Sequence, residues 1–329
     1  MNILQHHTSG RFRTNIEQRN SRLLANINEH FLQELPTLWN EEKIQHAAPH
    51  LMADYLRYFT DAIMLGWPKA HCIWLLSHAA EMGWMHFRML QDTEILTPIT
   101  LAGKELYLVP KASNSWNDAD TWLDACLANA ILGGQQAAID EICNYKTGMS
   151  SSQIQGQDNI SPHDAMFNVY EHYVMNDLSA KEQLQALQLA LQFSEQGKVA
   201  EVYDIEREHA IQFIAIPQIS LIASCWQRQE ATVSLTAKYA IEAHLDYYAD
   251  IMPEPGEPRG KDSIDLFDQS AMLMRDLLGF LALHYQRTGE SPDFESPYIP
   301  SWLIKGEFPS REEVLFNNPP VFDLKSVAS

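Results

Sequence analysis

Apolar residues recur at helical spacing through most of this chain. Between Ala237 and Tyr285 they outline two amphipathic helices joined by MPEPGEPRGKD, a connector whose Pro and Gly content is incompatible with a helix. The first of these helices carries a mostly acidic stripe beside its apolar face. The second, SIDLFDQSAMLMRDLLGFLALHY, is apolar around most of its circumference, which is typical of a helix buried inside a bundle.

Three further helices are predicted in the first 90 residues. Thr14 and Glu17 form a capping-box signature at the start of the first helix. The second helix is expected to begin near Pro49, because Pro is favoured in a first turn. The third follows Trp67-Pro68 and carries very few charges, so we expect it to run through the core.

The helical period is interrupted at TPITLAGKELYLVP. Alternating residues flank Ala102-Gly103-Lys104 there, which predicts a short β-hairpin at about residues 98–109. Helical spacing then resumes from Asn117 until it is ended by a pair of glycines, and a short helix follows. The hairpin is the one convincing strand signal, so the predicted fold class is all-α.

The second half of the chain begins after the Ser-, Gly- and Gln-rich segment Lys146–Ser161, which has the composition of a surface loop. Ser179 and Glu182 form a second capping box. Pro217 separates two apolar stretches and predicts a break or a kink. Beyond Thr288 repeated prolines exclude long helices, and a set of apolar residues is expected to hold this part against the bundle: Tyr298, Ile299, Trp302, Leu303 and Ile304.

These elements predict an irregular multi-helix bundle made of antiparallel helix pairs with one short β-hairpin. We expect a single domain over residues 1–329, divisible into two interlocked halves. Helices and the hairpin fill residues 14–145, further helices fill 162–305, and an extended tail covers 306–329. The chain has no fixed repeat of about 30 to 45 residues, so a solenoid is not favoured.

The charge balance excludes some classes of partner. The 329 residues include 43 acidic and 23 basic side chains, a formal net charge of −20. Nucleic-acid binding needs concentrated Lys and Arg, so it is not expected. The acidity favours a basic protein partner, or it serves solubility alone. The N-terminus lacks a signal-peptide pattern and no window approaches 18 uninterrupted apolar residues, so we expect a cytoplasmic protein without membrane contact.

Signatures of common enzymes are absent from the sequence, which contains no GxGxxG, GxxxxGK[ST], HExxH or GxSxG. His71, His78 and Glu81 share one helix and could be drawn as a metal site, but satisfied core histidines explain them as well. His163-Asp164 is similar to the doublet of helical metal-dependent phosphohydrolases, although no histidine lies between His86 and His163. We therefore predict no catalytic residue, no metal and no cofactor.

The four cysteines are far apart in the sequence and lie in apolar helical stretches, which predicts reduced core thiols: Cys72, Cys126, Cys143 and Cys225. The candidate binding site is instead an acidic rim around the connector of the opening helix pair, made of Glu242, Asp246, Asp250, Glu254, Glu257, Asp262 and Asp265. This rim is either a solvated face or an electrostatic docking site for a basic partner. The Lys146–Ser161 loop competes with it as a contact site.

The chain resembles the all-helical immunity proteins of polymorphic-toxin systems, in the family numbered forty-nine. The resemblance is carried by the block TWLDACLANAILGGQQAAIDEI, by LLGFLALHY at the end of the late helices, and by SPYIPSWLI after them. It covers roughly Thr14 to Ile304. Residues after Gly306 and the PEPGEPRGKD connector lie outside it, and these structural motifs carry over no catalytic residue.

This resemblance implies an antidote to a toxin that kin cells deliver by contact-dependent secretion, such as type VI secretion. The protein would bind its cognate toxin, which is expected to be basic, and neutralise it without catalysis. Two alternatives stay open: a metal-dependent phosphohydrolase that uses His163 and Asp164, and a helical scaffold that binds several proteins. The oligomeric state also stays open.

Overall fold

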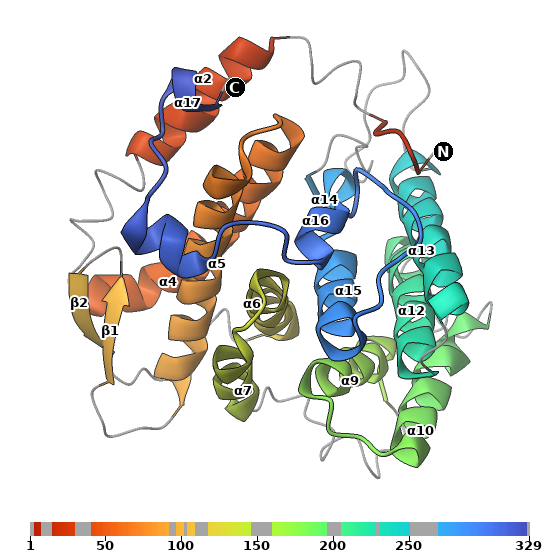
Figure 1. The fold of residues 1–329 in the computed structure, drawn as a ribbon. Helices are drawn as coiled ribbons and strands as arrows, with labels where there is room; N and C mark the ends of the chain where they lie inside the picture. The colour runs from red at the N-terminus through yellow and green to blue at the C-terminus, as the bar shows by residue number, and fades with distance from the viewer. Residues whose placement is uncertain are drawn as a thin grey trace. The chain divides into compact units, whose positions relative to one another are not determined.

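The computed structural model describes residues 3–7, 15–29, 41–91, 97–101, 104–108, 118–145, 160–195, 205–227, 230–250 and 269–327. The chain folds into two compact units. The N-terminal unit contains Ser9–Thr147 and Gly306–Ser329, and the C-terminal unit contains Gly148–Lys305 and Met1–Thr8 (Figure 1). The first residues of the chain therefore belong to the C-terminal unit, and the last residues belong to the N-terminal unit.

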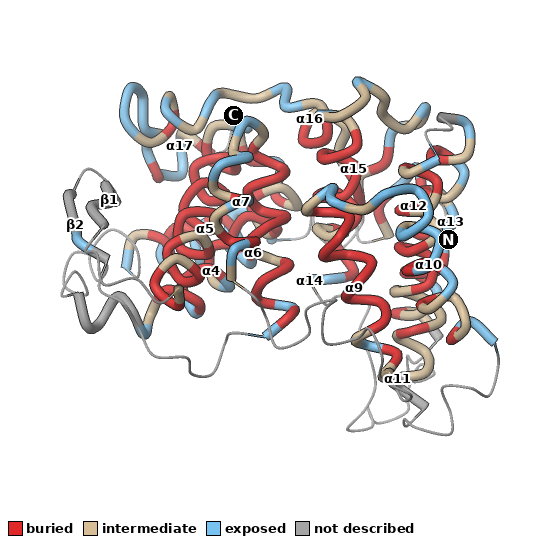
Figure 2. Tube along the Cα trace, turned by 90° about the horizontal axis from the view of Figure 1, so that it is seen from below, coloured by how far each residue is buried: buried red, intermediate tan, exposed pale blue. Residues whose placement is uncertain are grey.

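The N-terminal unit is built around one buried helix, α5 (Lys69–Leu90), which packs against α4, α6 and α7. Eighteen of the 22 residues of α5 are buried, as the sparse charges predict (Figure 2). The elements of this unit are α2 (Ile16–Asn26), α4 (Glu41–Met64), α5, β1 (Thr97–Leu101), β2 (Lys104–Leu108), α6 (Ala119–Leu132), α7 (Gln136–Asn144), the π-helical segment η4 (Glu313–Asn317) and α17 (Leu324–Val327).

One predicted helix start in this unit was wrong, and another falls partly outside the described residues. Helix α4 begins at Glu41 and includes Pro49 in its interior, where we expected a first turn. The residues after Pro49 bury Met52, Tyr55 and Phe59 almost completely, so packing outweighs the helix-breaking tendency of proline. Helix α2 begins at Ile16 with Asn15 at its N-cap in a left-handed conformation, φ 65°. Thr14 of the predicted capping box lies outside the described residues.

Strands β1 and β2 pair in antiparallel register, with Thr97 opposite Leu108 and Leu101 opposite Lys104. These strands occupy the segment where the alternating pattern departs from the helical period. The two residues between them, 102–103, lie outside the described residues. Both helices α4 and α5 contact β2, so the strand pair packs beside the helical core of the N-terminal unit.

Helix α5 approaches its neighbours most closely at Gly83. A Cβ atom built at this position would lie 2.7 Å from Ala125 Cβ in α6 and 2.7 Å from Met52 Sδ in α4. Real Cβ atoms do not approach other atoms so closely, so the absent side chain of Gly83 permits the contact among these three helices.

The C-terminal segment, which we define as Gly306–Val327, passes along α5 within the N-terminal unit (Figure 1). Lys69 Nζ donates a hydrogen bond to the carbonyl oxygen of Glu307 at 2.6 Å, and His71 Nε2 lies 2.9 Å from the carbonyl oxygen of Val321. The Phe322 ring packs against Trp74, with 4.7 Å between the ring centroids. We expected an extended tail here, whereas the segment contains two short helical stretches and is held at several points.

The C-terminal unit is a set of packed helices in which α12 contacts α9, α10, α13 and α15. Its elements are α9 (Pro162–Met175), α10 (Ala180–Leu191), the short 3-10 turn η2 (Gln192–Ser194), α11 (Ile205–Ala210), the π-helical segment η3 (Ile211–Ala215), α12 (Ile216–Gln227), α13 (Glu230–Asp250), α14 (Gln269–Met272), α15 (Arg275–Thr288) and α16 (Ser301–Ile304).

The long apolar helix predicted to end at Tyr285 is interrupted. Helix α14 ends at Met272, and α15 begins at Arg275. The amide of Met274 donates a hydrogen bond to the carbonyl oxygen of Tyr298 at 3.1 Å instead of continuing the helical ladder. A contact with a distant turn therefore replaces the helical bonds at this point, and the sequence pattern alone could not show it.

Pro217 lies inside a continuous helical run and does not separate two helices. The π-helical segment η3 immediately precedes α12, and Pro217 is the second residue of α12. Proline lacks an amide hydrogen, and the wider π turns accommodate this lost donor without ending the helix.

The second predicted capping box is confirmed at the start of α10. The Ser179 hydroxyl accepts from the amide of Glu182, and the Glu182 carboxylate accepts from the amide of Ser179 at 2.9 Å. Four of the five apolar residues expected to pin the chain after Thr288 are also buried, namely Tyr298, Ile299, Leu303 and Ile304.

The first residues of the chain pack onto this unit through Tyr298. The Tyr298 hydroxyl accepts a hydrogen bond from the His7 amide at 2.9 Å, and the His6 and Tyr298 rings stack with centroids 4.7 Å apart. The Ser296 hydroxyl donates to the carbonyl oxygen of Ile3 at 2.6 Å. These contacts attach the N-terminal residues to a segment almost 300 positions later.

Among the described residues one helical run, Glu208–Gln227, is long and apolar enough to cross a membrane by length and composition alone. Its most apolar window has a mean hydropathy of 1.3 and is 44% buried. The core helix of a soluble protein passes the same test, so this property is weak evidence for a membrane span.

Candidate functional site

Helix α13 carries the described part of the predicted acidic rim. Its inner face packs against α12 and is made of residues that are almost completely buried, including Ala237, Ala240, Ile241 and Leu245. This packing follows from the i, i+3, i+4, i+7 apolar pattern of the sequence. The opposite face of the helix must therefore point away from the core.

Polar contacts also hold α13 in position. The His244 side chain lies with its Nε2 atom 2.9 Å from the carbonyl oxygen of Ser270. The hydroxyl of Ser234 accepts a hydrogen bond from the amide of Asp293 at 3.0 Å. Lys238 Nζ lies 3.4 Å from the carboxylate of Asp293 and 4.8 Å from the ring centroid of Phe294. The helix is thus fixed against both α14 and the chain that follows α15.

The outward face of α13 presents four side chains that we call the α13 stripe: Leu235, Tyr239, Glu242 and Asp246. They follow one another at i, i+4, i+7 and i+11, which places them within about 60° of each other around the helix and along about 16 Å of its length. Leu235 is 66% exposed and Tyr239 is 50% exposed, and both acidic residues are exposed. Two large apolar side chains thus continue directly into two carboxylates.

The structure places the predicted rim residues unequally. Glu242 and Asp246 lie on the α13 stripe, and Asp250 is the last residue of α13, with a side chain outside the described set. The other four rim residues lie outside the described residues: Glu254, Glu257, Asp262 and Asp265. Almost all of the competing Lys146–Ser161 loop also lies outside them. Leu235 and Tyr239 were missed by sequence analysis: their spacing to Glu242 places them on the same face of the helix, but their exposure depends on the packing of α13.

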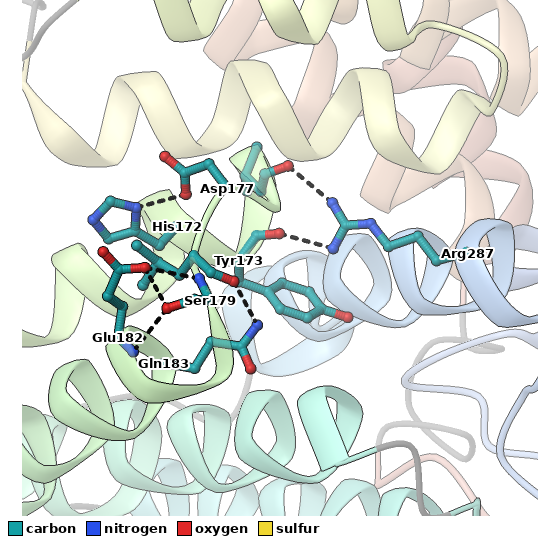
Figure 3. Close-up of polar contacts among 9 residues, drawn as sticks. His172, Tyr173, Asp177, Ser179, Glu182, Gln183 and Arg287 are labelled. Carbon is teal, nitrogen blue, oxygen red and sulfur yellow. Dashed lines mark hydrogen bonds and ion pairs between the residues drawn. The ribbon is translucent and has the colours of Figure 1, made fainter.

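A second group of polar side chains lies where α9 meets α10 and α15 (Figure 3). Arg287 donates to the carbonyl oxygens of Tyr173 and Val174, at 2.8 and 2.9 Å, and these residues form the last turn of α9. His172 Nδ1 lies 2.8 Å from the carboxylate of Asp177. A cation near the C-terminus of a helix satisfies carbonyls that have no helical partner and complements the helix dipole. We therefore expect these side chains to stabilise the fold of the C-terminal unit.

The predicted phosphohydrolase doublet begins α9. The Ser161 hydroxyl accepts a hydrogen bond from the amide of Asp164 at 3.1 Å, so Ser161 is the N-cap and Asp164 lies in the first turn. The side chain of His163 is exposed. Within the described part of the chain, no three His, Cys, Asp or Glu residues are grouped so that they could hold a metal ion. Both residues of the doublet therefore lie in the first turn of α9.

The histidines of α5 are core residues, as the simpler of the two interpretations predicts. His78 is fully buried, stacks on Tyr55 with ring centroids 5.2 Å apart, and burial lowers its pKa to about 3. The Glu81 carboxylate pairs with Arg311 of the C-terminal segment at 3.1 Å. The sequence could not indicate this partner, because Arg311 lies 230 positions away.

The cysteine prediction is confirmed: all four cysteines are free and buried. Burial raises the pKa of Cys72 to about 12, and it raises the pKa of Cys225 to about 12 as well. Thiols with such high pKa values stay protonated at neutral pH and are poor nucleophiles.

Comparison with known protein families shows a match between residues 68–303 and the family described as Immunity protein 49 (Imm49). The matched span starts at the N-cap of α5 and ends in α16, so it includes the core helix of the N-terminal unit and most of the C-terminal unit. Comparisons with curated proteins and with solved structures gave no match. The match covers most of the chain and confirms the resemblance seen in the sequence. This protein therefore belongs to the Immunity protein 49 family.

Proposed function

We propose that this protein is a cytoplasmic antidote that binds a cognate toxin and neutralises it without catalysis. The observation that carries this proposal is the family match over residues 68–303. In such a system the toxin is delivered by contact between kin cells, for example by type VI secretion, and the antidote acts on the toxin after it arrives.

We also propose that the toxin is basic and meets the acidic rim made of Glu242, Asp246, Asp250, Glu254, Glu257, Asp262 and Asp265. The net charge of −20 supports this, since an acidic protein attracts a basic partner over long range. The exposure of Glu242 and Asp246 supports it locally. Lys238, the one Lys or Arg in α13, is paired with Asp293 and so does not oppose the two carboxylates.

The proposal is tested by co-expression with the toxin encoded beside this protein. Growth should be restored when both are made, and the two proteins should purify as a complex. Absence of both rescue and complex formation would contradict the proposal. Binding in a purified system without metal or cofactor, with the toxin recovered intact, would separate sequestration from enzymatic inactivation of the toxin.

The role of the rim is tested by changing Glu242, Asp246 and Glu257 to Lys. These changes should slow association with the toxin at low salt more than they change the unfolding midpoint, because charges at the edge of an interface act mainly on the association rate. An unchanged association rate would remove the rim from the proposed mechanism.

A further inference from the structure

We infer that the α13 stripe is the centre of an interface with a basic protein domain, in which Leu235 and Tyr239 enter an apolar pocket of the partner while Glu242 and Asp246 meet its cationic margin. This inference rests on the proposed function and deepens it. It names the apolar residues that anchor the partner and gives the apolar and the acidic side chains different roles in binding.

The first observation is the placement of the two apolar side chains. Residues at i and i+4 on a helix are neighbours with Cβ atoms about 5 to 6 Å apart, so Leu235 and Tyr239 form one continuous apolar surface. Among the described residues of the C-terminal unit, the other large apolar side chains that are strongly exposed are Leu4 and Leu184, which lie on different segments. Single exposed apolar residues are ordinary, whereas exposed apolar side chains that adjoin one another, as these two do, are more frequent at interaction sites.

The second observation is the rigidity of the support. The inner face of α13 is buried against α12, and the contacts of Ser234, Lys238 and His244 fix the helix along its length. A Tyr side chain on such a helix loses little conformational freedom on binding and offers both an apolar ring and a hydroxyl. The side chains of the α13 stripe are therefore presented on a rigid helix before a partner binds, and binding does not have to order that helix.

The third observation is the order of side chains along the stripe. The apolar pair lies in the N-terminal half and the two carboxylates follow within the next two turns, so an apolar area borders directly on a negative one. Interfaces combine a desolvated centre rich in aromatic residues with a polar, charged margin. The complementary surface is an apolar pocket bordered by Lys or Arg, which identifies the partner as a basic domain.

The inference is tested by binding kinetics with the toxin domain encoded beside this protein. The apolar variant combines Leu235→Ala with Tyr239→Ala, and the charge variant combines Glu242→Lys with Asp246→Lys. Leu184→Ala is a matched control for the loss of an exposed apolar side chain in the same unit. Glu29→Lys with Glu312→Lys is the charge control, since it changes the net charge by the same amount at exposed positions of the N-terminal unit.

The apolar variant should raise the dissociation rate by roughly 10- to 100-fold and leave the association rate within about twofold of wild type. The charge variant should lower the association rate by about 10-fold at low salt and weaken its dependence on salt. Both controls should behave as wild type, and all variants should keep the wild-type unfolding midpoint because the changed side chains are exposed.

Three results would overturn the inference. If the wild-type protein binds and neutralises the toxin while the stripe variants match their controls, the inference fails and the proposed function stands. If the wild type does not bind the toxin, the proposed function and the inference fail together. If sedimentation shows a wild-type dimer that Tyr239→Ala dissociates, the stripe belongs to a second copy of this chain.

Discussion

Arg311 Nη2 lies 3.1 Å from Glu81 Oε1, so a residue of the C-terminal segment pairs with a carboxylate in the middle of the buried helix α5. A second guanidinium nitrogen of Arg311 donates to Gln135 Oε1 at 3.2 Å. Burial raises the pKa of Glu81 to about 7, and the charge of Arg311 opposes that rise. The pair thus joins the C-terminal segment to the core at a site where the carboxyl group changes its charge near neutral pH.

This pair predicts that the stability of the N-terminal unit falls as the pH rises through 7. The pKa of Glu81 in the folded protein lies above the ordinary value of 4.5, so the protonated form is favoured by folding and its contribution is lost at higher pH. Between about pH 6 and about pH 8.5 the expected loss is on the order of 1 kcal/mol. Glu81→Gln cannot titrate and should show a flatter profile in denaturant unfolding across this range. Equal slopes for the two proteins would contradict the prediction.

Arg287 should contribute strongly to the stability of the C-terminal unit. Replacing it by Met keeps most of the apolar stem but leaves two carbonyls in the last turn of α9 without their donor. Hydrogen bonds to a charged group are worth about 1.5 to 3 kcal/mol, and we expect a loss of about 3 kcal/mol in the free energy of unfolding. Lys238→Met is the matched control, because its ion pair is partly exposed and should be worth less than about 1 kcal/mol. Similar losses in the two variants would refute the assignment.

Phe322 should anchor the C-terminal segment. Its ring packs against Trp74 and lies 5.2 Å, centroid to centroid, from the ring of His71. Phe322→Ala should cost about 3 kcal/mol and increase hydrogen exchange in the C-terminal segment. Phe316, which is 49% exposed, provides the control: Phe316→Ala should change the stability by less than about 0.5 kcal/mol. If both variants leave hydrogen exchange unchanged, Phe322 does not hold the segment.

Gly83→Ala should destabilise the N-terminal unit even though Ala favours helix by about 1 kcal/mol. The new methyl group would lie 2.7 Å from Ala125 Cβ and 3.0 Å from Ala125 Cα, and the main chain of α6 cannot move away easily. Overpacking of this kind costs about 1 to 3 kcal/mol. Adding Ala125→Gly removes one of the two side-chain atoms at 2.7 Å, the other being Met52 Sδ, so the double variant should recover part of the loss. A positive coupling in the double-mutant cycle checks the geometry, and simple additivity would contradict it.

Local features of the fold were predictable from the sequence. The capping box of Ser179 and Glu182 was found because its donors and acceptors are three residues apart. The buried face of α13 and the core position of α5 followed from apolar spacing and from the scarcity of charge. The free, buried thiols followed from the separation and apolar surroundings of the four cysteines. The predictions about helices depend on residues within a few helical turns.

Other features depended on contacts between distant residues. The break between α14 and α15 exists because Met274 bonds to Tyr298, and Pro49 stays within α4 because the residues around it are buried. In the candidate site, too, some features were predictable from the sequence and others depended on packing. Glu242 and Asp246 were identified from charge, whereas the exposure of Leu235 and Tyr239 depended on how α13 packs against α12.

By itself the sequence determined the all-helical class, the faces of the helices that are buried, and the resemblance to the immunity family. Only the tertiary structure decided that each terminus joins the unit formed by the opposite part of the chain, that Arg311 meets Glu81, and that Leu235 and Tyr239 stay exposed. The physical reason is that helix formation and amphipathic spacing act over a few residues. Long-range pairing and the solvent exposure of a particular apolar side chain depend on the whole packed unit.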